Sequence, residues 1–394
     1  MNTPAAIVLG GSFNAVSICR SLAPDRIEVI ALGTGGVDFV RRSRHCDRYV
    51  GFGRGTKLQV AWLAWLVENA PGLRDSVLLP AEDDALELIA TRRAELVALG
   101  YRPFEADDRA LLAMLDKGQT AEIARAADIP LPRTHEIGDD ASAEEAVADL
   151  GFPLALKPRH SHVMARKALR LGKLVVVENR PELAERMAFL RAHDIEVLAM
   201  EIIPGGDNQL VSYYTYIDEH GEPLLHFCKQ QIRANPPTFG LSTYQRSCWD
   251  PELIETSLRF FRQAGVRGLV NVQFKRDTHD GALKLIECNH RFTAANELVR
   301  RAGINLARLT YDRALGRPHA PIAPCVGETW MWDPISDTKA MLALRAAGAL
   351  TIRHWLTTLF HRQHLPLLCL DDPLPAFVRL GGTVRSAWGV RRGT

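Results

Sequence analysis

A strand–turn–strand segment that ends in polar residues places the strongest constraint on the fold of this chain. Residues 271–291 read NVQFKRDTHDGALKLIECNHR, two largely apolar runs joined by the polar turn DTHDG, and this pattern predicts a β-hairpin. Glu287, Asn289 and Arg291 are two residues apart, so a strand places them on one face. Gln273 on the first strand lies opposite or diagonal to Glu287 and Asn289. A carboxylate and two amides therefore converge at the end of the hairpin.

This polar cluster is typical of a site for a hard cation and phosphate. Gln273, Glu287 and Asn289 offer the oxygen ligands that Mg²⁺ accepts, while water and phosphate supply the remaining ligands; Mn²⁺ is an alternative ion. Arg291 would add a fixed positive charge beside the same phosphates. Because the cluster contains no nucleophile, it indicates phosphoryl chemistry on bound ATP. A solvated polar strand end is the structural alternative.

Composition limits the protein classes. A chain of 394 residues predicts two or three structural units, and the balance of 48 basic against 46 acidic residues gives no reason to expect nucleic acid or an anionic membrane as a partner. Seven scattered cysteines without a CxxC pair disfavour a zinc site and a disulfide framework. The N-terminus does not resemble a secretion signal, and no long apolar run predicts a transmembrane helix. We therefore expect a cytoplasmic protein.

The N-terminal segment predicts a nucleotide-binding type of α/β domain. Residues 5–9 and Ile27–Leu32 form short apolar runs, separated by GGSFN and a helical pattern, which is a βαβ opening. The turn lacks GxGxxG, and the second strand ends in ALGTGG without an acid for a ribose hydroxyl, which argues against a dinucleotide-dependent oxidoreductase. The N–H groups of the turn can instead face a small anion such as a carboxylate.

Charged residues also mark the starts of helices and the end of one strand. Glu82, Asp83 and Asp84 open a predicted helix, where they favour the helix dipole; a carboxylate that faces a bound amine is the alternative. Lys117 precedes another helix. Lys157 follows the apolar run PLAL and precedes Pro158, Arg159 and His160, so several cations gather at that strand end.

These residues carry a resemblance to a known family. NVQF followed by IECNHR resembles the NVQF…IEVNPR signature of the ATP-grasp superfamily, particularly of the carbamoyl-phosphate synthetase large subunit and of carboxylate–amine ligases like D-aspartate ligase. The GG turn, LDKGQT…IPLPRT, FPLALKP and MEIIPGGD resemble further family segments in the same order. The resemblance implies an α/β ATP-grasp fold with a Rossmann-like pre-ATP-grasp domain at 1–112 and an ATP-grasp domain at 113–319. The latter would divide into a lysine-bearing lid at 113–195 and a metal-binding part at 196–319, followed by a C-terminal helical extension at 320–394.

The resemblance also implies a role for each matching residue. Lys117 and Lys157 would contact the ATP phosphates, and Lys157 the adenine edge as well. Glu201 and the backbone of Ile203 would bind adenine at the hinge, and Asp207 would bind the ribose hydroxyls. Mg²⁺ would bind Gln273, Glu287 and Asn289, and Arg291 would stabilise the transferring phosphoryl group.

Four positions depart from the family pattern. The stretch after Lys157, RHSHVMARKALRLGK, has no glycine before Gly172, although this loop is usually glycine-rich. Asp207 follows Glu201 by six residues where seven is common, so Asn208 is an alternative ribose ligand. His290 stands where proline is usual. Gln273 replaces the more frequent acidic ligand, as in carbamoyl-phosphate synthetase.

These features together predict a Mg-ATP-dependent ligase for small molecules. A carboxylate would become an acylphosphate, and an amine, in our interpretation that of an amino acid, would displace phosphate to form an amide. Lys229 and Arg233 are candidate substrate contacts, with solvated loop cations as the alternative. The rival functions are a carboxylase or carbamate-forming enzyme of the same fold, a non-catalytic nucleotide-binding or regulatory protein, and a Rossmann oxidoreductase. A homodimer is compatible with the sequence.

The C-terminal tail has helical spacing without any motif that we can link to chemistry. Lys339–Leu365 combines apolar residues with interleaved Arg and His. This pattern suits a helix pair packed on the core or in a subunit contact, and an interfacial membrane helix is the alternative. Gly348 and Thr351 predict a break, which favours a helix–turn–helix.

Overall fold

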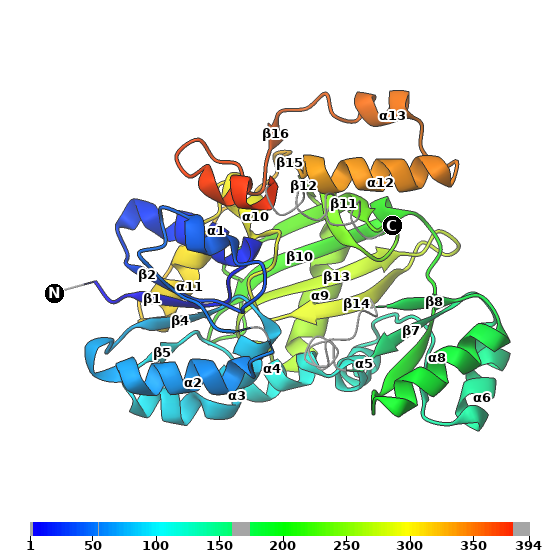
Figure 1. The fold of residues 1–394 in the computed structure, drawn as a ribbon, viewed down its shortest axis with the longest axis horizontal. Helices are drawn as coiled ribbons and strands as arrows, with labels where there is room; N and C mark the ends of the chain where they lie inside the picture. The colour runs from blue at the N-terminus through cyan, green and yellow to red at the C-terminus, as the bar shows by residue number, and fades with distance from the viewer. Residues whose placement is uncertain (1–2, 54, 160–173, 381–394) are drawn as a thin grey trace, which may run out of the picture.

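The computed structural model describes residues 3–53, 55–159 and 174–380, and these residues form three β-sheets (Figure 1). The first sheet is parallel and N-terminal. The second is a small antiparallel sheet at the lower right of the view, and the third is a long sheet that runs through the centre. The candidate site lies where the second sheet faces the third.

The N-terminal sheet has the strand order β3-β2-β1-β4-β5. Its elements are β1 (Ala6–Leu9), α1 (Phe13–Leu22), β2 (Val29–Leu32), β3 (Arg48–Val50), α2 (Leu58–Asn69), β4 (Val77–Pro80), α3 (Asp83–Ala98) and β5 (Arg102–Pro103), with short 3-10 turns at Ala23–Asp25, Phe39–Arg42 and Ala70–Gly72. Strand β1 is buried on both sides: Ile7 and Leu9 face the core under α2 and α3, and Ala6 and Val8 face α1. Continuous apolar strands are typical of such doubly covered parallel sheets, and the predicted βαβ opening is confirmed.

The turn after β1 is closed by a tight contact with Asp38. A Cβ added to Gly11 would lie 2.0 Å from Oδ1 of Asp38, so only glycine fits there. The Asp38 carboxylate accepts hydrogen bonds from the N–H groups of Thr34 and Gly35 and from the Tyr49 hydroxyl. This carboxylate thereby ties the loop after β2 to the glycine turn.

The small sheet has the order β6-β9-β7-β8, with its helices on one side (Figure 1). Its elements, with the two helices that lead into it, are α4 (Asp108–Leu115), α5 (Lys117–Ala126), β6 (Thr134–Ile137), α6 (Asp140–Leu150), β7 (Leu154–Pro158), β8 (Val175–Val177), α8 (Arg180–Ala192) and β9 (Val197–Glu201). A separate apolar core lies between this sheet and helices α6 and α8. Because its core is separate, the small sheet forms a distinct packing unit beside the large one.

The large sheet has the order β14-β13-β10-β11-β12-β15-β16. Its elements are β10 (Leu210–Ile217), β11 (Phe227–Asn235), β12 (Leu241–Cys248), β13 (Gly268–Arg276), β14 (Leu283–Asn289), β15 (Trp330–Trp332) and β16 (Gln363–His364), with the 3-10 turn Asp207–Gln209 and helices α9 (Pro251–Ala264), α10 (Asn296–Arg301) and α11 (Leu306–Ala314). Helix α9 packs its apolar side on one face of this sheet. The predicted hairpin is β13–β14, and Gln273 lies directly opposite Glu287.

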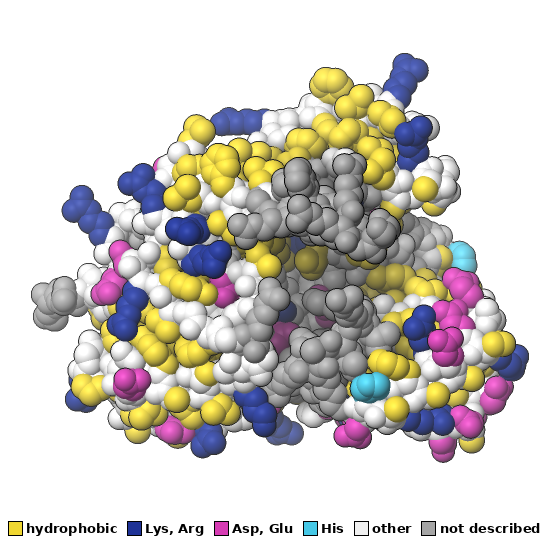
Figure 2. All heavy atoms as spheres, in the orientation of Figure 1, with side chains coloured by type: hydrophobic (Ala, Val, Ile, Leu, Met, Phe, Trp, Pro, Cys, Tyr) yellow, Lys and Arg dark blue, Asp and Glu magenta, His cyan; other side chains and the backbone are white. Residues whose placement is uncertain are grey.

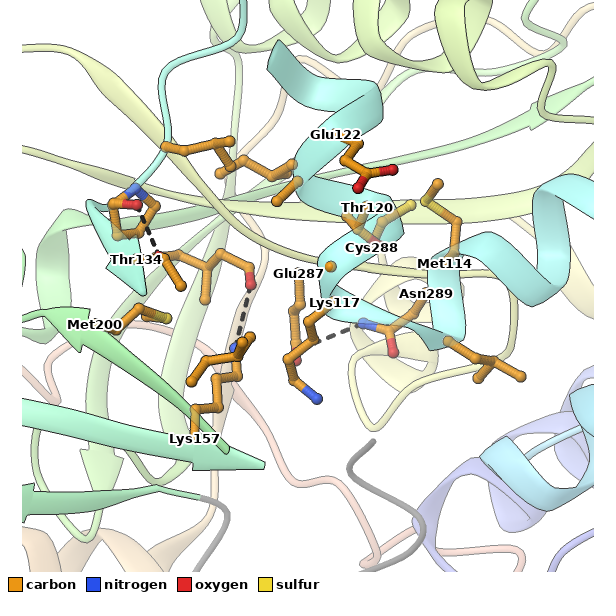
Figure 3. A pocket seen from close by; sticks show the side chains of 18 of the residues that line it. Met114, Lys117, Thr120, Glu122, Thr134, Lys157, Met200, Glu287, Cys288 and Asn289 are labelled. Atoms are coloured by element: carbon orange, nitrogen blue, oxygen red, sulfur yellow. Dashed lines mark hydrogen bonds between the residues drawn. The ribbon is translucent and has the colours of Figure 1, made fainter. Parts of the chain in front are cut away.

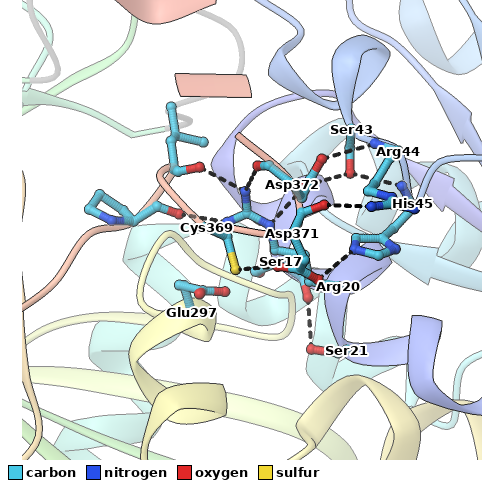
Figure 4. A network of polar contacts seen from close by, with 12 residues as sticks. Ser17, Arg20, Ser21, Ser43, Arg44, His45, Glu297, Cys369, Asp371 and Asp372 are labelled. Atoms are coloured by element: carbon cyan, nitrogen blue, oxygen red, sulfur yellow. Dashed lines mark hydrogen bonds and ion pairs between the residues drawn. The ribbon is translucent and has the colours of Figure 1, made fainter. Parts of the chain in front are cut away.

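The C-terminal extension adds β15, α12 (Pro334–Ala346), α13 (Ile352–Thr357) and β16 to the large sheet. Gly348, at φ +70°, lies between the two helices, so the predicted helix–turn–helix is confirmed. Two buried ion pairs attach the extension: Arg233–Asp337 at 2.8 Å and Arg20–Asp372 at 2.9 Å. In Figure 4, Asp372 also accepts hydrogen bonds from the Ser43 hydroxyl and the Arg44 N–H. Among the described residues, no helix is long and apolar enough to cross a membrane.

Candidate active site

A pocket between the small sheet and the edge of the large sheet brings most of the predicted site residues together. Figure 2 shows that the visible face of the molecule is hollowed in this central region. The lining comes from the helices α3, α4 and α5, the small sheet and β14 with the residues that follow it. It includes Asp83, Met114, Lys117, Thr120, Glu122, Leu131, Thr134, Glu136, Lys157, Leu198, Met200, Leu285, Glu287, Asn289, His290 and Arg291. Figure 3 shows Lys117 and Lys157 approaching the end of β14 from different elements.

The predicted metal ligands lie on one face of the β13–β14 hairpin. Gln273 pairs with Glu287 in register, and Asn289 donates to Oε1 of Glu287 at 3.3 Å. Asn271 stiffens the strand end, because its Nδ2 donates to the carbonyls of Asn289 and Arg291 at 3.1 and 3.3 Å. One carboxylate and two amides suit a hard cation such as Mg²⁺. Within the described part of the chain, no group of three or more His, Cys, Asp and Glu side chains could hold a metal.

A β-bulge explains how Lys157 meets the hairpin. The register of β13–β14 shifts after Gln273, so Ile286 has no partner residue in the pairing. Bulges free backbone groups and re-aim side chains, and Nζ of Lys157 reaches the carbonyl of Ile286 at 3.3 Å. Lys117, at the start of α5, donates to the carbonyl of Arg159 at 3.1 Å. The two lysines therefore place positive charge above the carboxylate–amide cluster.

Arg291 is held by helix α3 of the N-terminal region rather than left in solvent. Its Nε forms an ion pair with Asp83 at the start of α3. Burial would lower the pKa of Arg291, but the Asp83 carboxylate outweighs this effect and raises it. The helix start predicted at Glu82, Asp83 and Asp84 is confirmed, and the structure shows in addition that the Asp83 carboxylate orients a pocket arginine. Its neighbour Glu82 accepts from the Ser12 hydroxyl at 3.1 Å, and burial raises its pKa.

The hinge residues Glu201 and Ile203 lie at the end of β9 and just after it, outside the pocket lining. Glu201 forms ion pairs with Lys284 at 2.7 Å and Arg133 at 2.8 Å. Burial would raise the pKa of Glu201, but these two cations lower it. The Ile203 carbonyl accepts from Nζ of Lys275 at 2.7 Å. Salt bridges and this backbone contact therefore hold the hinge strand in place.

Asp207 does not join the other predicted ligands. It is buried, and its two carboxylate oxygens accept from the N–H groups of Ala234 and Thr238, each at 2.8 Å. Burial raises the pKa of Asp207 despite these hydrogen bonds. The carboxylate thereby fixes the turn between β11 and β12, and this geometry gives the predicted ribose contact no support.

The two candidate substrate contacts, Lys229 and Arg233, lie on β11 and are both buried. Neither is therefore the solvated loop cation that the sequence left as the alternative. Arg233 is buried, and it pairs with Asp337 while its guanidinium lies 4.6 Å from the centre of the Tyr244 ring. Its role is therefore to hold the C-terminal extension, and the predicted substrate contact by Arg233 is wrong. Lys229 is also buried, on the sheet face that carries Gln273. The glycine-poor loop predicted to cover the phosphates lies largely outside the described residues.

Sequence reasoning missed the apolar end of the pocket. Leu131, Leu198, Met200 and Leu285 line it together. An apolar slot between two sheets suits a flat aromatic ring such as a nucleobase. Leu198 and Met200 alternate along β9 with buried residues, so the only available signal was a strand pattern that also describes an ordinary core.

The chain is similar to several proteins of one superfamily. Residues 238–329 match the family model described as "ATP-grasp in the biosynthetic pathway with Ter operon". D-alanine–D-alanine ligase of Acinetobacter baylyi is 24% identical over 246 residues, which cover 55% of this chain and 75% of the ligase. The carbamoyl phosphate synthase large chain of Methanobrevibacter smithii is 25% identical over 206 residues, covering 48% of this chain but 18% of that much longer protein.

The fold agrees with these matches. N5-carboxyaminoimidazole synthetase from Staphylococcus aureus, solved as a complex with ADP, superimposes with a TM-score of 0.62 at 13% identity, covering 81% of this chain and 79% of that one. At this identity the likeness concerns the fold. Family model, relatives and fold all point the same way: this chain is similar to proteins of the ATP-grasp superfamily, in agreement with its sequence motifs.

Proposed function

We propose that this protein is a Mg-ATP-dependent carboxylate–amine ligase that forms an amide through an acylphosphate. One observation carries the proposal: a single pocket contains an apolar slot, two lysines and a carboxylate–amide cluster followed by Arg291. The slot suits adenine, and the lysines suit the phosphates. Similarity to D-alanine–D-alanine ligase and the ADP complex of the similar synthetase support the same assignment.

The reaction would proceed in two displacements. An oxygen of the substrate carboxylate attacks the γ-phosphorus, the bond to the β-phosphate oxygen breaks, and ADP leaves with the electron pair. The amine nitrogen then attacks the acylphosphate carbon, the carbon–oxygen bond to phosphate breaks, and the nitrogen loses a proton as the amide forms. The protein contributes position and charge rather than a nucleophile.

Each pocket residue would have a defined task in this scheme. Lys117 and Lys157 would neutralise phosphate oxygens from the α5 and β7 sides. Arg291, oriented by Asp83, would stabilise the transferring phosphoryl group. Gln273, Glu287 and Asn289 would hold Mg²⁺, and the bound ion would offset charge that develops on the phosphates.

Phosphate release from Mg-ATP with a matrix of amino acids and small carboxylates tests this function. We expect release to require one carboxylate together with one amine, and amide to form in equal amount with phosphate. Release stimulated by bicarbonate without an amine would favour the carboxylase alternative. Nucleotide binding without phosphate release under any combination would favour a regulatory protein. Thermal stabilisation by NAD and none by Mg-ATP would contradict the superfamily chemistry altogether.

A further inference from the structure

A row of polar side chains crosses the large sheet from the metal-ligand cluster to its middle. Glu287 on β14 faces Gln273 on β13, which faces Ser212 on β10; Ser212 faces Lys229 on β11, and Lys229 faces Ser247 on β12. Residues directly opposite one another in antiparallel strands point to the same side of the sheet. Lys229 therefore shares a face with the predicted Mg²⁺ ligands, three strands away from β14.

Lys229 is a buried cation with neutral hydrogen-bond partners. Its side chain is 5% exposed, and its Nζ donates to Oε1 of Gln245 at 2.8 Å and to the Ser242 hydroxyl at 3.5 Å. No carboxylate forms an ion pair with it among the described residues. Burial lowers the pKa of Lys229 to about 8, although the charge of Glu287 opposes this effect, so the ammonium is still mainly protonated at pH 7. A buried charge without a counter-charge is costly for the fold.

Gln231 adds an unused donor beside this lysine. It lies two residues further along β11 and is 3% exposed. Its Oε1 accepts from the same Ser242 hydroxyl that contacts Lys229, so the two side-chain ends are neighbours. Its Nε2 is buried and has no hydrogen-bond partner in the part of the chain that the structure describes. A buried donor left without an acceptor also costs stability.

Arg233, the next residue on this side of β11, shows that the fold can supply a counter-charge to a buried cation. Arg233 is as buried as Lys229, yet two oxygens of Asp337 accept from it at 2.8 Å each. The same strand therefore satisfies one cation with a carboxylate and leaves the other with amide and hydroxyl partners. Lys229 thus offers an ammonium and Gln231 offers an N–H without an acceptor, and among the described residues no carboxylate pairs with either of them. Together they complement an anionic oxygen pair.

We propose that Lys229 and the Nε2 of Gln231 bind the carboxylate of the substrate that becomes phosphorylated. This assignment rests on the proposed ligase function. The γ-phosphate of ATP is the other source of anionic oxygens. We assign the carboxylate because Lys117, Lys157 and Arg291 already line the pocket at β14, whereas strand spacing puts the backbone of Lys229 roughly 14 Å from that strand. A side chain at this distance reaches a second substrate beyond the phosphates.

The first test needs no substrate. If Lys229 has no counter-charge until a substrate anion binds, Lys229→Met removes an uncompensated buried charge. The melting temperature of this variant then stays at or above that of the wild type. Lys275→Met is the matched control: Lys275 is a buried lysine on the same face, but its Nζ donates to the Ile203 carbonyl at 2.7 Å, and the charges of Asp207 and Asp277 act on it. We expect the control to melt several degrees lower. An equally large decrease for Lys229→Met would overturn the proposal, since Lys229 would then be a structural residue.

The second test uses the carboxylate that the phosphate-release matrix identifies. Lys229→Met should raise the KM for that carboxylate at least about thirtyfold, the effect of losing a charge-assisted contact, while the KM for Mg-ATP stays within about twofold. Lys229→Arg, which keeps the charge, should restore part of the affinity, and Gln231→Leu should raise the same KM by less. An unchanged KM for the carboxylate in Lys229→Met would overturn the assignment.

Nucleotide titrations separate the two anions. The thermal shifts that Mg-ADP and the non-hydrolysable Mg-AMP-PNP produce in Lys229→Met should equal those in the wild type. A loss confined to Mg-AMP-PNP would assign Lys229 to the γ-phosphate and overturn the carboxylate subsite. If no carboxylate supports phosphate release in the wild type, the ligase function fails, yet the melting comparison still decides whether Lys229 is a structural lysine.

Discussion

Two regions of the large sheet differ in the hydrogen-bond partners that surround a buried cation. Where the C-terminal extension covers β11 and β12, Asp337 accepts hydrogen bonds from Arg233, Thr243, Trp332 and Trp355 at 2.7–2.9 Å. On the face towards the pocket, Lys229 has neutral partners within the described residues. A completed network of this kind stabilises a contact between parts of the chain, whereas a cation with neutral partners is ready for an anion from outside. The first region builds the fold, and the second is the place to look for substrate.

The largest effect should come from breaking the completed network. Asp337→Ala leaves the Arg233 guanidinium buried without its carboxylate, and removal of one partner from a buried pair typically costs about 3–5 kcal/mol. Urea unfolding followed by circular dichroism measures this loss. The double variant Arg233→Met/Asp337→Leu removes both charges and should recover most of the stability. A loss of less than about 1 kcal/mol, as for a surface pair, would mean that the extension is held by apolar packing alone.

His290 offers a pH-dependent test of the pocket region. It is fully buried, and neither ring nitrogen has a hydrogen-bond partner in the described structure. Burial lowers its pKa to about 4, with Asp107 opposing the shift. Because the folded pKa lies below the ordinary value of about 6.5, the unfolded state takes up the proton first, and stability is lost as pH falls from about 6.5 towards 4.

The His290→Leu variant isolates this contribution. At pH 5 the wild type should have lost about 2 kcal/mol through this histidine relative to pH 7.5, and the variant should lack that part of the pH dependence. Urea unfolding at the two pH values gives both numbers. Parallel decreases in the two proteins would show that His290 keeps an ordinary pKa in the folded state.

The residues predicted correctly from the sequence are mostly those whose geometry is local. Gln273 and Glu287 belong to one hairpin, so strand periodicity and a short turn were sufficient to place them opposite each other. The break at Gly348 was likewise visible in a short window of the sequence. The ATP-grasp resemblance came from ordered local motifs, and the matches with known proteins confirm it.

The errors concern partners that are distant in sequence. Arg233 was taken for a candidate substrate contact because Asp337, its partner, lies 104 residues away. The ion pair of Asp83 with Arg291 was not predicted, because the two residues are 208 positions apart. No local pattern reports such pairs. The predicted domain boundaries, the homodimer and the cytoplasmic location stay predictions.

A smaller, kinetic effect tests the metal-ligand cluster. Glu287→Gln removes the one formal negative charge among the three proposed ligands, and phosphate release should fall at least tenfold, which corresponds to about 1.4 kcal/mol of transition-state stabilisation. Glu255→Gln, the same change on α9 across the sheet, is the matched control and should leave the rate unaltered. Full activity in a folded Glu287→Gln protein would remove Glu287 from the proposed Mg²⁺ site.

The smallest effect is expected where the extension faces outwards. Figure 2 shows hydrophobic side chains gathered at the upper right, over α12 and α13, with basic residues at their rim. Phe360 is 83% exposed and Leu356 is 49% exposed, and residues 338–370 contain no acidic residue. An interfacial membrane helix has these features. However, α13 spans only Ile352–Thr357, and the extension is already attached to the core by its two buried ion pairs.

We therefore expect the purified protein to stay in the supernatant when it is centrifuged with phosphatidylglycerol vesicles at physiological salt. Deletion of residues 339–394 should give an insoluble or unfolded product, because Arg20 would lose Asp372 and would be left without its buried counter-charge. Sedimentation with the vesicles that weakens as salt is added, and that a folded deletion variant no longer shows, would reverse this expectation, since screening by salt identifies attraction between basic side chains and anionic lipid. The outward face of the extension would then be a membrane-binding surface. The inner face, where Asp337 and Asp372 neutralise buried arginines, would differ from it within the same extension.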